Sequence, residues 1–154
     1  MNDHRSDIRR IMTAVNTIDG IYALEAKKIG LKENTLSLLY ALDDGKAHTQ
    51  TQICAEWLIP KTTINTIVKE CIHAGYVTLE AGGHSHEKRI KLTEQGQAYA
   101  KNVLAQVYAI EEKAMEKTTG QFSLEFIDAV QQFSCHLRRE FDNYFKEEPH
   151  ESIL

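Results

Sequence analysis

The sequence contains few of the residues that mark specialised classes of protein. Its 154 residues include 2 prolines, 8 glycines and 3 cysteines. This composition excludes collagen-like and low-complexity disordered chains, and an odd number of cysteines without CxxC spacing argues against a disulfide framework or a structural zinc site. No apolar run approaches the roughly 18 residues of a membrane helix, and the N-terminus lacks the apolar stretch of a signal peptide. We therefore expect a folded cytoplasmic protein with no membrane partner.

Catalytic signatures are also missing. The sequence has no glycine-rich phosphate loop, GxSxG elbow, HExxH helix or spaced carboxylate motif. We therefore expect no enzyme activity, no cofactor and no resident metal. His84 and His86 are spaced so that they could share an ion, but no third ligand is obvious nearby. Cys54 and Cys71 fall at apolar positions typical of core residues, and a redox role for Cys135 stays open.

Charge is distributed unevenly along the chain. The whole sequence carries 18 basic and 22 acidic residues, a net charge of −4. Residues 46–93 nevertheless contain six basic and four acidic residues, a net charge of +2, and four of the seven histidines. The remainder carries 12 basic and 18 acidic residues, a net charge of −6. This asymmetry predicts a basic module, suited to a polyanion, between acidic arms.

Apolar residues recur at helical spacing near both ends of the chain. The pattern predicts a helix over residues 5–28, a long helix capped by Thr93 that ends near residues 118–120, and a last helix capped by Ser123. A monomer of this layout could not cover the apolar stripes of two long helices, so we expect a homodimer. The predicted interface residues are Ile8, Ile11, Val15, Phe133, Leu137, Phe141, Tyr144 and Phe145.

Shorter elements fill the middle of the chain. A very apolar helix ends at Leu42, and the capping-box spacing of Thr49 and Gln52 predicts a helix of about two turns. Pro60 suits the first turn of a fourth helix, in which one face is apolar and the other polar. The expected inward face of the two-turn helix is Ile53, Cys54, Trp57 and Leu58.

Two extended runs follow the fourth helix. Residues 77–81 and 88–92 flank a tip that contains Gly82 and Gly83, which is typical of an antiparallel hairpin. Lys88, Arg89 and Lys91 give this hairpin three positive charges. Two short helices, a polar-faced second helix and a basic hairpin together predict a winged helix-turn-helix, in which the second helix enters the major groove of DNA.

The same segments resemble the multiple-antibiotic-resistance-regulator (MarR) type of bacterial transcription factor. The resemblance rests on residues 31–42, 49–57, 60–77 and the run 92–96, and it covers nearly the whole chain. It implies a mainly α fold with a small β-hairpin, in which residues 31–93 form the winged helix-turn-helix. Residues 1–30 and 94–146 would form the N- and C-terminal dimerisation helices, and residues 147–154 a flexible tail.

The resemblance also implies a function. Members of this family bind a pseudo-palindromic double-stranded DNA operator as homodimers, so we expect an effector-released repressor. The runner-up hypothesis is a winged-helix module that binds another protein. The expected DNA contacts are Lys61, Thr62, Thr63, Asn65, Thr66, Lys69, His84, His86, Lys88 and Arg89.

The sequence departs from the family pattern at two expected DNA contacts. His84, Ser85 and His86 stand where the wing tip usually carries Asp, one residue and Arg. The phosphate or minor-groove contact would then fall either to Lys88 or Arg89 or to the histidines in their protonated form. Thr66 stands where arginine is common. Base readout would then depend on Asn65, which can bond adenine, and on threonine methyl groups that suit thymine, which favours an A·T-rich operator.

Family members often bind small aromatic or anionic effectors beside the winged lobe. The resemblance therefore suggests an effector pocket, although core packing is the more common role for any single aromatic residue. The candidate pocket residues are Tyr22, Tyr40, Trp57 and Tyr108.

Overall fold

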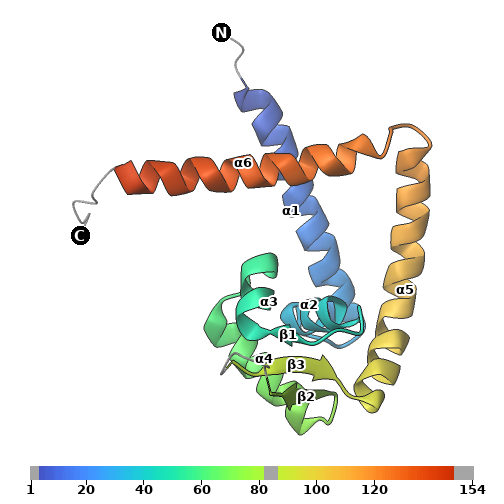
Figure 1. Cartoon of the computed structure of the whole chain (residues 1–154). Coiled ribbons are helices and arrows are strands. Elements are labelled where there is room, and N and C mark those ends of the chain that lie inside the picture. Colours follow the sequence, from blue (N-terminus) through green and yellow to red (C-terminus); the bar gives the residue numbers. More distant parts are fainter. Residues whose placement is uncertain (1–3, 82–86, 148–154) are drawn as a thin grey trace. The chain divides into compact units, whose positions relative to one another are not determined.

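The computed structural model describes residues 4–81 and 87–147, and Figure 1 shows their helices and strands. The fold is mainly α with a small antiparallel sheet, which confirms the expected fold class. The sheet has three strands in the order β1-β3-β2, and so one strand more than the predicted hairpin. The elements are α1 (Arg5–Lys28), α2 (Glu33–Leu42), β1 (His48–Thr49), α3 (Gln50–Trp57), α4 (Lys61–His73), β2 (Val77–Glu80), β3 (Arg89–Leu92), α5 (Glu94–Thr119) and α6 (Glu125–Glu147).

The chain divides into two compact units. The first, Met1–Gln106, holds every element from α1 to β3 and the first part of α5. The second, Val107–Leu154, holds the rest of α5 and α6. None of the described helices is both long and apolar enough to cross a membrane.

Side-chain caps fix where α3 and α5 begin. Thr49 and Gln52 form a reciprocal capping box, in which the backbone N–H of Gln52 donates to Thr49 Oγ1 at 3.1 Å and the N–H of Thr49 donates to Gln52 Oε1 at 2.8 Å. Thr93 accepts from the N–H of Gly96 at 2.9 Å and starts α5. Gly75 follows α4 with φ +77°, a conformation that glycine adopts without steric cost.

The core of the first unit is apolar and joins all three helices of the helix-turn-helix region to the sheet. Four leucines of α2 are buried, and α3 adds Ile53. One face of α4 is buried over its whole length, and β3 turns alternate residues inward. Burial of about sixteen such side chains is the main favourable contribution to folding. The residues of α4 and β3 that take part are Ile64, Ile67, Val68, Cys71, Ile90 and Leu92.

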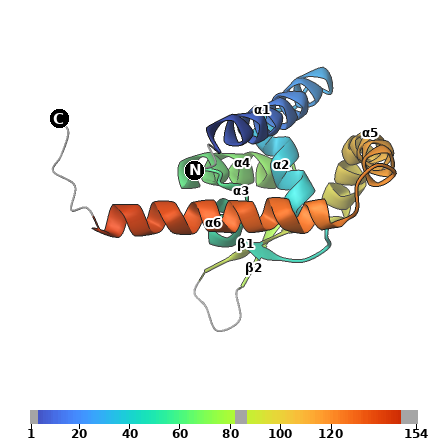
Figure 2. The ribbon, with the colours of Figure 1, turned by 90° about the horizontal axis from the view of Figure 1, so that it is seen from above.

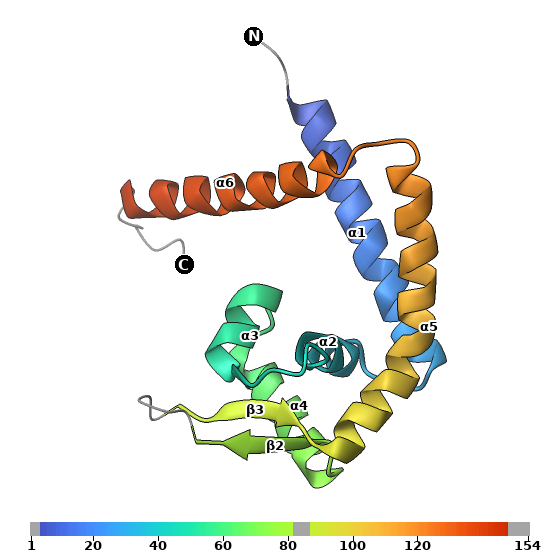
Figure 3. The ribbon, with the colours of Figure 1, turned by 45° about the vertical axis from the view of Figure 1, so that its right-hand side comes forward.

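Antiparallel pairing places strands β2 and β3, which form the wing, beside this core. Strands β2 and β3 pair from Val77 opposite Leu92 to Glu80 opposite Arg89, and they lie side by side next to α4 in Figure 3. The short strand β1 pairs with the outer edge of β3, with Thr49 opposite Arg89. In the view from above, the strands lie on the side of α3 and α4 that is opposite to α1 (Figure 2).

Three sequence predictions were wrong in detail. Trp57 and Leu58 do not face the core, because Leu58 takes a left-handed conformation with φ +50° that ends α3, and their exposed fractions are 39% and 74%. Pro60 is the residue before the first turn of α4 rather than a member of it. Helix α6 continues through Glu147, so the predicted tail loses its first residue, and residues 148–154 lie outside the described part of the chain.

Gly96 lies against the backbone where α5 leaves the sheet. A Cβ atom at this position would stand 1.9 Å from the carbonyl oxygen of Tyr76, whereas a Cβ at Gly20 of α1 would meet nothing within 4 Å. The neighbour at Gly96 is backbone, which cannot move away without disturbing β2. Only glycine therefore fits this position.

We predict that Gly96→Ala destabilises the protein by about 3 kcal/mol, because an overpacked site forces the backbone apart. Gly20→Ala is the matched control and should be neutral or stabilising by up to about 1 kcal/mol, since alanine favours an exposed helix. Urea unfolding followed by circular dichroism measures both. Equal stability of the two variants would contradict the packing of α5 against β2.

Candidate nucleic-acid interface

Helix α4 separates its residues into a buried side and an exposed side. Burial of Ile64, Ile67, Val68 and Cys71 fixes the rotation of the helix about its axis. The opposite side therefore faces solvent. Of the residues expected to contact DNA, Thr63 and Asn65 are half-buried, and the exposed ones on this helix are Lys61, Thr62, Thr66 and Lys69.

The threonine hydroxyl in the middle of this face is already engaged. Thr66 Oγ1 donates to the carbonyl oxygen of Thr62 at 3.1 Å, one helical turn earlier. This bond fixes the hydroxyl on its own helix. A threonine held in this way offers its methyl group as well as its oxygen to a partner that approaches the exposed face.

The wing adds positive charge near α4. Lys88 and Arg89 are both exposed, and Arg89 opens β3. The other two residues expected to contact DNA on the wing, His84 and His86, lie outside the described residues. The structure therefore places eight of the ten predicted DNA contacts, six on α4 and two on the wing.

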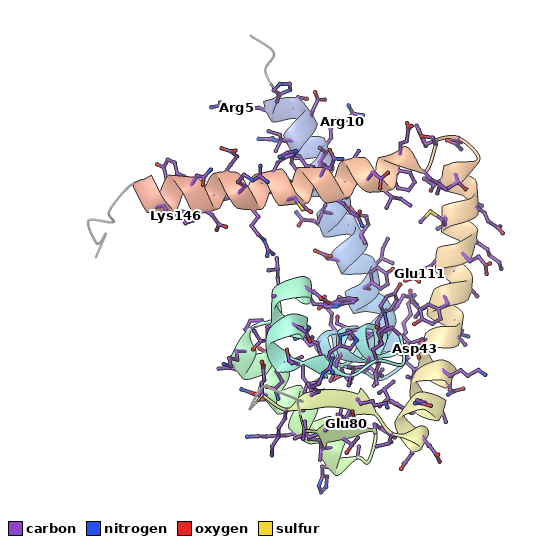
Figure 4. All side chains as sticks on the ribbon, viewed as in Figure 1. Arg5, Arg10, Asp43, Glu80, Glu111 and Lys146 are labelled. Carbon is purple, nitrogen blue, oxygen red and sulfur yellow. The ribbon has the colours of Figure 1, made fainter. Side chains whose placement is uncertain are left out.

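Several lysines of this unit form ion pairs. Lys91 lies 3.6 Å from Glu80, which is labelled in Figure 4, and Lys46 lies 4.0 Å from Asp44. Within residues 4–81 and 87–147, Lys69, Lys88 and Arg89 have no ion-pair partner. Unpaired exposed cations on one helix and on the wing are suited to a polyanion.

A carboxylate at the loop end of the wing, two residues before β3, is bound to α3. Glu87 Oε1 accepts a hydrogen bond from Thr51 Oγ1 at 2.6 Å and one from the Thr51 backbone N–H at 3.2 Å. The hydroxyl bond lowers the pKa of the Glu87 carboxyl below its ordinary value, with smaller contributions from the N–H and from the charge of Lys61. This contact connects the wing to the first turn of α3, and sequence spacing gave no sign of it.

Lys32 and Asn34 are further polar neighbours of α4 that sequence reasoning missed. Together with Thr62, Thr63 and Thr66 they line a hollow of about 330 Å³ on the first unit. Lys32 Nζ also donates to both carboxylate oxygens of Glu70, at 2.8 and 3.0 Å. Lys32 and Glu70 are 38 residues apart in the sequence, so no local pattern could have revealed this pair.

The turn before β1 is held by one carboxylate. Asp44 Oδ1 accepts from the backbone N–H of Lys46 at 2.9 Å and lies 2.9 Å from His48 Nε2. The His48 contact, followed by the Lys46 N–H, lowers the pKa of the Asp44 carboxyl below its ordinary value. His48 is the first residue of β1, so this contact positions the strand that borders the wing.

A groove of about 440 Å³ lies beside the helix-turn-helix on the first unit. Three of the four candidate pocket residues, Tyr22, Tyr40 and Trp57, line it, and the rings of Tyr40 and Trp57 meet edge to face with centroids 5.6 Å apart. We name this cavity the aromatic groove after these three residues. Tyr108 lies on α5 in the second unit, and its place relative to the groove is not defined.

The predicted dimer residues are mostly exposed. On α1, Ile8, Ile11 and Val15 have exposed fractions of 43%, 39% and 39%. On α6 the exposed fraction is 39% at Leu137 and 54% at Phe141, and Phe133 is half-buried. No described residue of the second unit is fully buried. The remaining aromatic residues of the stripe, also exposed, are Tyr144 and Phe145.

The three cysteines differ in environment. Burial raises the pKa of the Cys71 thiol, which disfavours the reactive thiolate and agrees with a role in packing. Cys54 is half-buried, and Cys135 is exposed on α6.

Comparison with known proteins identifies this arrangement. Residues 29–86, which run from the end of α1 across the helix-turn-helix and into the wing, match the sequence model of the MarR family. Over this segment the chain is similar to the MarR family. No curated protein matches the sequence.

Solved structures agree with the MarR-type fold over almost the whole chain. The structure is similar to that of NMB1585, a MarR family regulator from Neisseria meningitidis, with a TM-score of 0.77 and 21% identity over 94% of this chain and 99% of that one. It is also similar to the MarR family transcriptional regulator SPO1453 from Silicibacter pomeroyi DSS-3, with a TM-score of 0.69 and 18% identity over 84% and 93% of the two chains. The transcriptional regulator BldR from Sulfolobus solfataricus gives a TM-score of 0.71 and 11% identity over 88% and 99%. At these identities the likeness establishes the fold of MarR-type regulators.

The contact between Glu87 and Thr51 predicts a pH dependence. Because the folded protein holds the pKa of Glu87 low, the carboxylate adds stability above its ordinary pKa of about 4, and this contribution is lost as the pH falls through the lower folded value. Thr51→Val removes the hydroxyl donor and should raise the pKa of Glu87 toward its ordinary value. Titration of the Glu87 carboxyl by NMR measures the shift. An identical pKa in wild type and Thr51→Val would mean that the hydroxyl does not bind the carboxylate in solution.

Proposed function

We propose that this chain is a sequence-specific transcriptional regulator that binds double-stranded DNA. The observation that carries the proposal is the exposed polar side of α4 beside a wing whose cations, Lys88 and Arg89, have no ion-pair partner among the described residues. In proteins with a winged helix-turn-helix, the second helix of the motif enters the major groove of the duplex. The fold of MarR-type regulators supports the same role for α4.

The residues of α4 divide into two kinds of proposed DNA contact. Lys61 and Lys69 carry charge on long side chains and would neutralise phosphates, which positions the protein without reading sequence. Asn65 can bond the N6 and N7 atoms of adenine, and threonine methyl groups suit the methyl of thymine. The exposure of Thr66 on this side of α4 supports this assignment. We therefore propose an A·T-rich operator, with Thr62, Thr63, His84, His86, Lys88 and Arg89 as further contacts.

We propose that the regulator acts as a homodimer. The second unit buries no described residue, yet α6 carries a continuous apolar stripe, and α1 exposes another. Apolar stripes of this length are stable in water only against a partner. Residues 1–30 and 94–146 would provide the dimer contacts and residues 31–93 the DNA contacts. Two winged lobes would then read two half-sites about one helical turn apart.

We propose that the protein represses transcription and that an effector relieves this repression. A cytoplasmic dimer that occupies a promoter would block transcription, and a ligand that prefers another dimer geometry would lower the affinity for the operator by shifting the population. The aromatic groove supports an effector site, because its volume of about 440 Å³ falls in the range of small-molecule pockets, roughly 300–1,000 Å³.

We predict separate effects for the two kinds of contact on α4. Lys69→Ala should weaken binding to operator and random DNA alike and lower the slope of log affinity against log salt by about 1. Asn65→Ala should chiefly reduce the preference for operator over random DNA, by about 1–3 kcal/mol. Lys101→Ala, an exposed lysine of α5, is the matched charge control. Fluorescence anisotropy with promoter DNA of its own operon, at several salt concentrations, measures all three.

The same titrations separate DNA binding from the alternative of a protein-binding scaffold. Counterion release makes phosphate contact strongly salt-dependent. Absence of binding, or binding that salt does not weaken, would favour the scaffold. Unchanged sequence preference in Asn65→Ala would reject the assignment of Asn65 to base readout.

We predict that Phe141→Asp abolishes the dimer and, with it, operator binding, because it buries a charge in an apolar interface. Asn143→Asp adds the same charge to an exposed position off the stripe of α6 and should leave the dimer intact. Analytical ultracentrifugation measures the oligomeric state of both variants. A monomeric Phe141→Asp protein with full operator affinity would refute the interface.

A further inference from the structure

The aromatic groove has an acidic rim. Among the residues that line it are Asp19 of α1 and Glu33 of α2, both exposed, and no lysine, arginine or histidine. Neither carboxylate forms an ion pair within the described residues. The groove therefore has negative charge at its rim and nothing in its lining to balance it.

Aromatic rings form the walls behind this rim. Tyr22, Tyr40 and Trp57 come from three different helices, and Ile18 and Leu58 add aliphatic surface. The exposed fraction of Leu58 is 74%, so its side chain is available to an incoming ligand. Aromatic faces attract cations within about 6 Å, most strongly at tryptophan. The aromatic walls and the carboxylates therefore both favour a positively charged ligand.

An anionic ligand would meet the opposite conditions. Its charge would be repelled by both rim carboxylates, and the lining offers no cation to compensate. Anionic aromatic effectors, which the family resemblance had suggested, are therefore unfavourable for this chain. Charge, apolar walls and volume instead favour a compact cation with an apolar body.

We infer that the aromatic groove binds small organic cations, such as aromatic ammonium compounds, with the positive charge near Asp19 and Glu33 and the apolar body against Tyr40 and Trp57. This inference names the effector class of the proposed regulator, and its regulatory consequence rests on that proposed function. Binding to the groove itself does not depend on DNA.

Trp57 makes the inference directly measurable. It is the only tryptophan in the sequence, so the intrinsic indole fluorescence of the protein reports on this groove. The probe is benzyltrimethylammonium. Its neutral isostere, neopentylbenzene, has the same shape without the charge, and phenylacetate supplies the anion. The expected order of affinity is cation, then neutral isostere, with no measurable binding of the anion. Equal affinity for cation and isostere, or tighter binding of the anion, would overturn the inference.

Charge variants test the rim. Asp19→Asn and Glu33→Gln should each weaken benzyltrimethylammonium binding about fivefold, as expected for loss of one carboxylate near the cation. Neither variant should change the affinity for the neutral isostere. Glu56→Gln, on α3 beside Trp57 but outside the lining, is the matched control and should bind as wild type. Because Glu33 lies in the first turn of α2, its loss also affects helix stability, which calorimetric unfolding records separately. Rim variants that bind the cation like wild type would overturn the inference.

A final experiment separates this inference from the proposed function. Benzyltrimethylammonium is added to the full-length protein with and without its promoter DNA. Cation binding to a protein that does not bind DNA supports the groove assignment and rejects the regulator. DNA binding without any cation binding rejects the groove assignment alone, including the case in which a segment of the second copy fills the groove. Cation binding that lowers operator affinity supports both.

Discussion

The rotation of α4 about its own axis is the constraint on which the proposed interface depends. Four apolar side chains of this helix, spaced at i, i+3, i+4 and i+7, are buried against α2, α3 and the sheet. Turning the helix far enough to hide Lys61 or Lys69 would expose those side chains to water, at a cost of roughly 1.5–3 kcal/mol for each of the larger ones. The core therefore determines which side chains meet a ligand, although none of the core residues would touch it.

The wing is held to the same core by two different means. Ile90 and Leu92 bury the inner face of β3, and the carboxylate of Glu87 binds the start of α3. Burial fixes the base of the hairpin, whereas the carboxylate contact fixes its direction relative to the helix-turn-helix. Because Glu87 also lies near Lys61, its charge reduces the net positive charge at one end of α4. The contact that orients the wing therefore also weakens the attraction of α4 for a polyanion.

Helical periodicity, caps and turn residues predicted nearly all of the fold. The limits of α1, the capping box at Thr49 and the cap at Thr93 agree with the structure because each depends on residues within one or two turns. Strand β1 was missed because two residues are too few for an alternating pattern. Leu58 was placed inward because an apolar residue after a helix resembles its continuation, and only the left-handed backbone shows otherwise. The groove, the pair of Lys32 with Glu70 and the wing contact join residues far apart in sequence, so spacing could not reveal them.

The aromatic groove connects the two parts of the proposed mechanism within one unit. One wall belongs to α1, whose outer stripe is a proposed dimer surface, and another is the turn of residues 57–60 that leads directly into α4. Leu58 in this turn keeps a left-handed backbone that costs roughly 1–2 kcal/mol for a residue with a Cβ atom. A ligand in contact with both walls would change the relative stability of their arrangements, and a change in the entry to α4 alters the direction of its exposed face. Coupling of this kind requires only that the ligand prefer one arrangement of α1 and the turn over the other. Because both α1 and the turn line the groove, a ligand bound there contacts both elements and can therefore favour one arrangement of them.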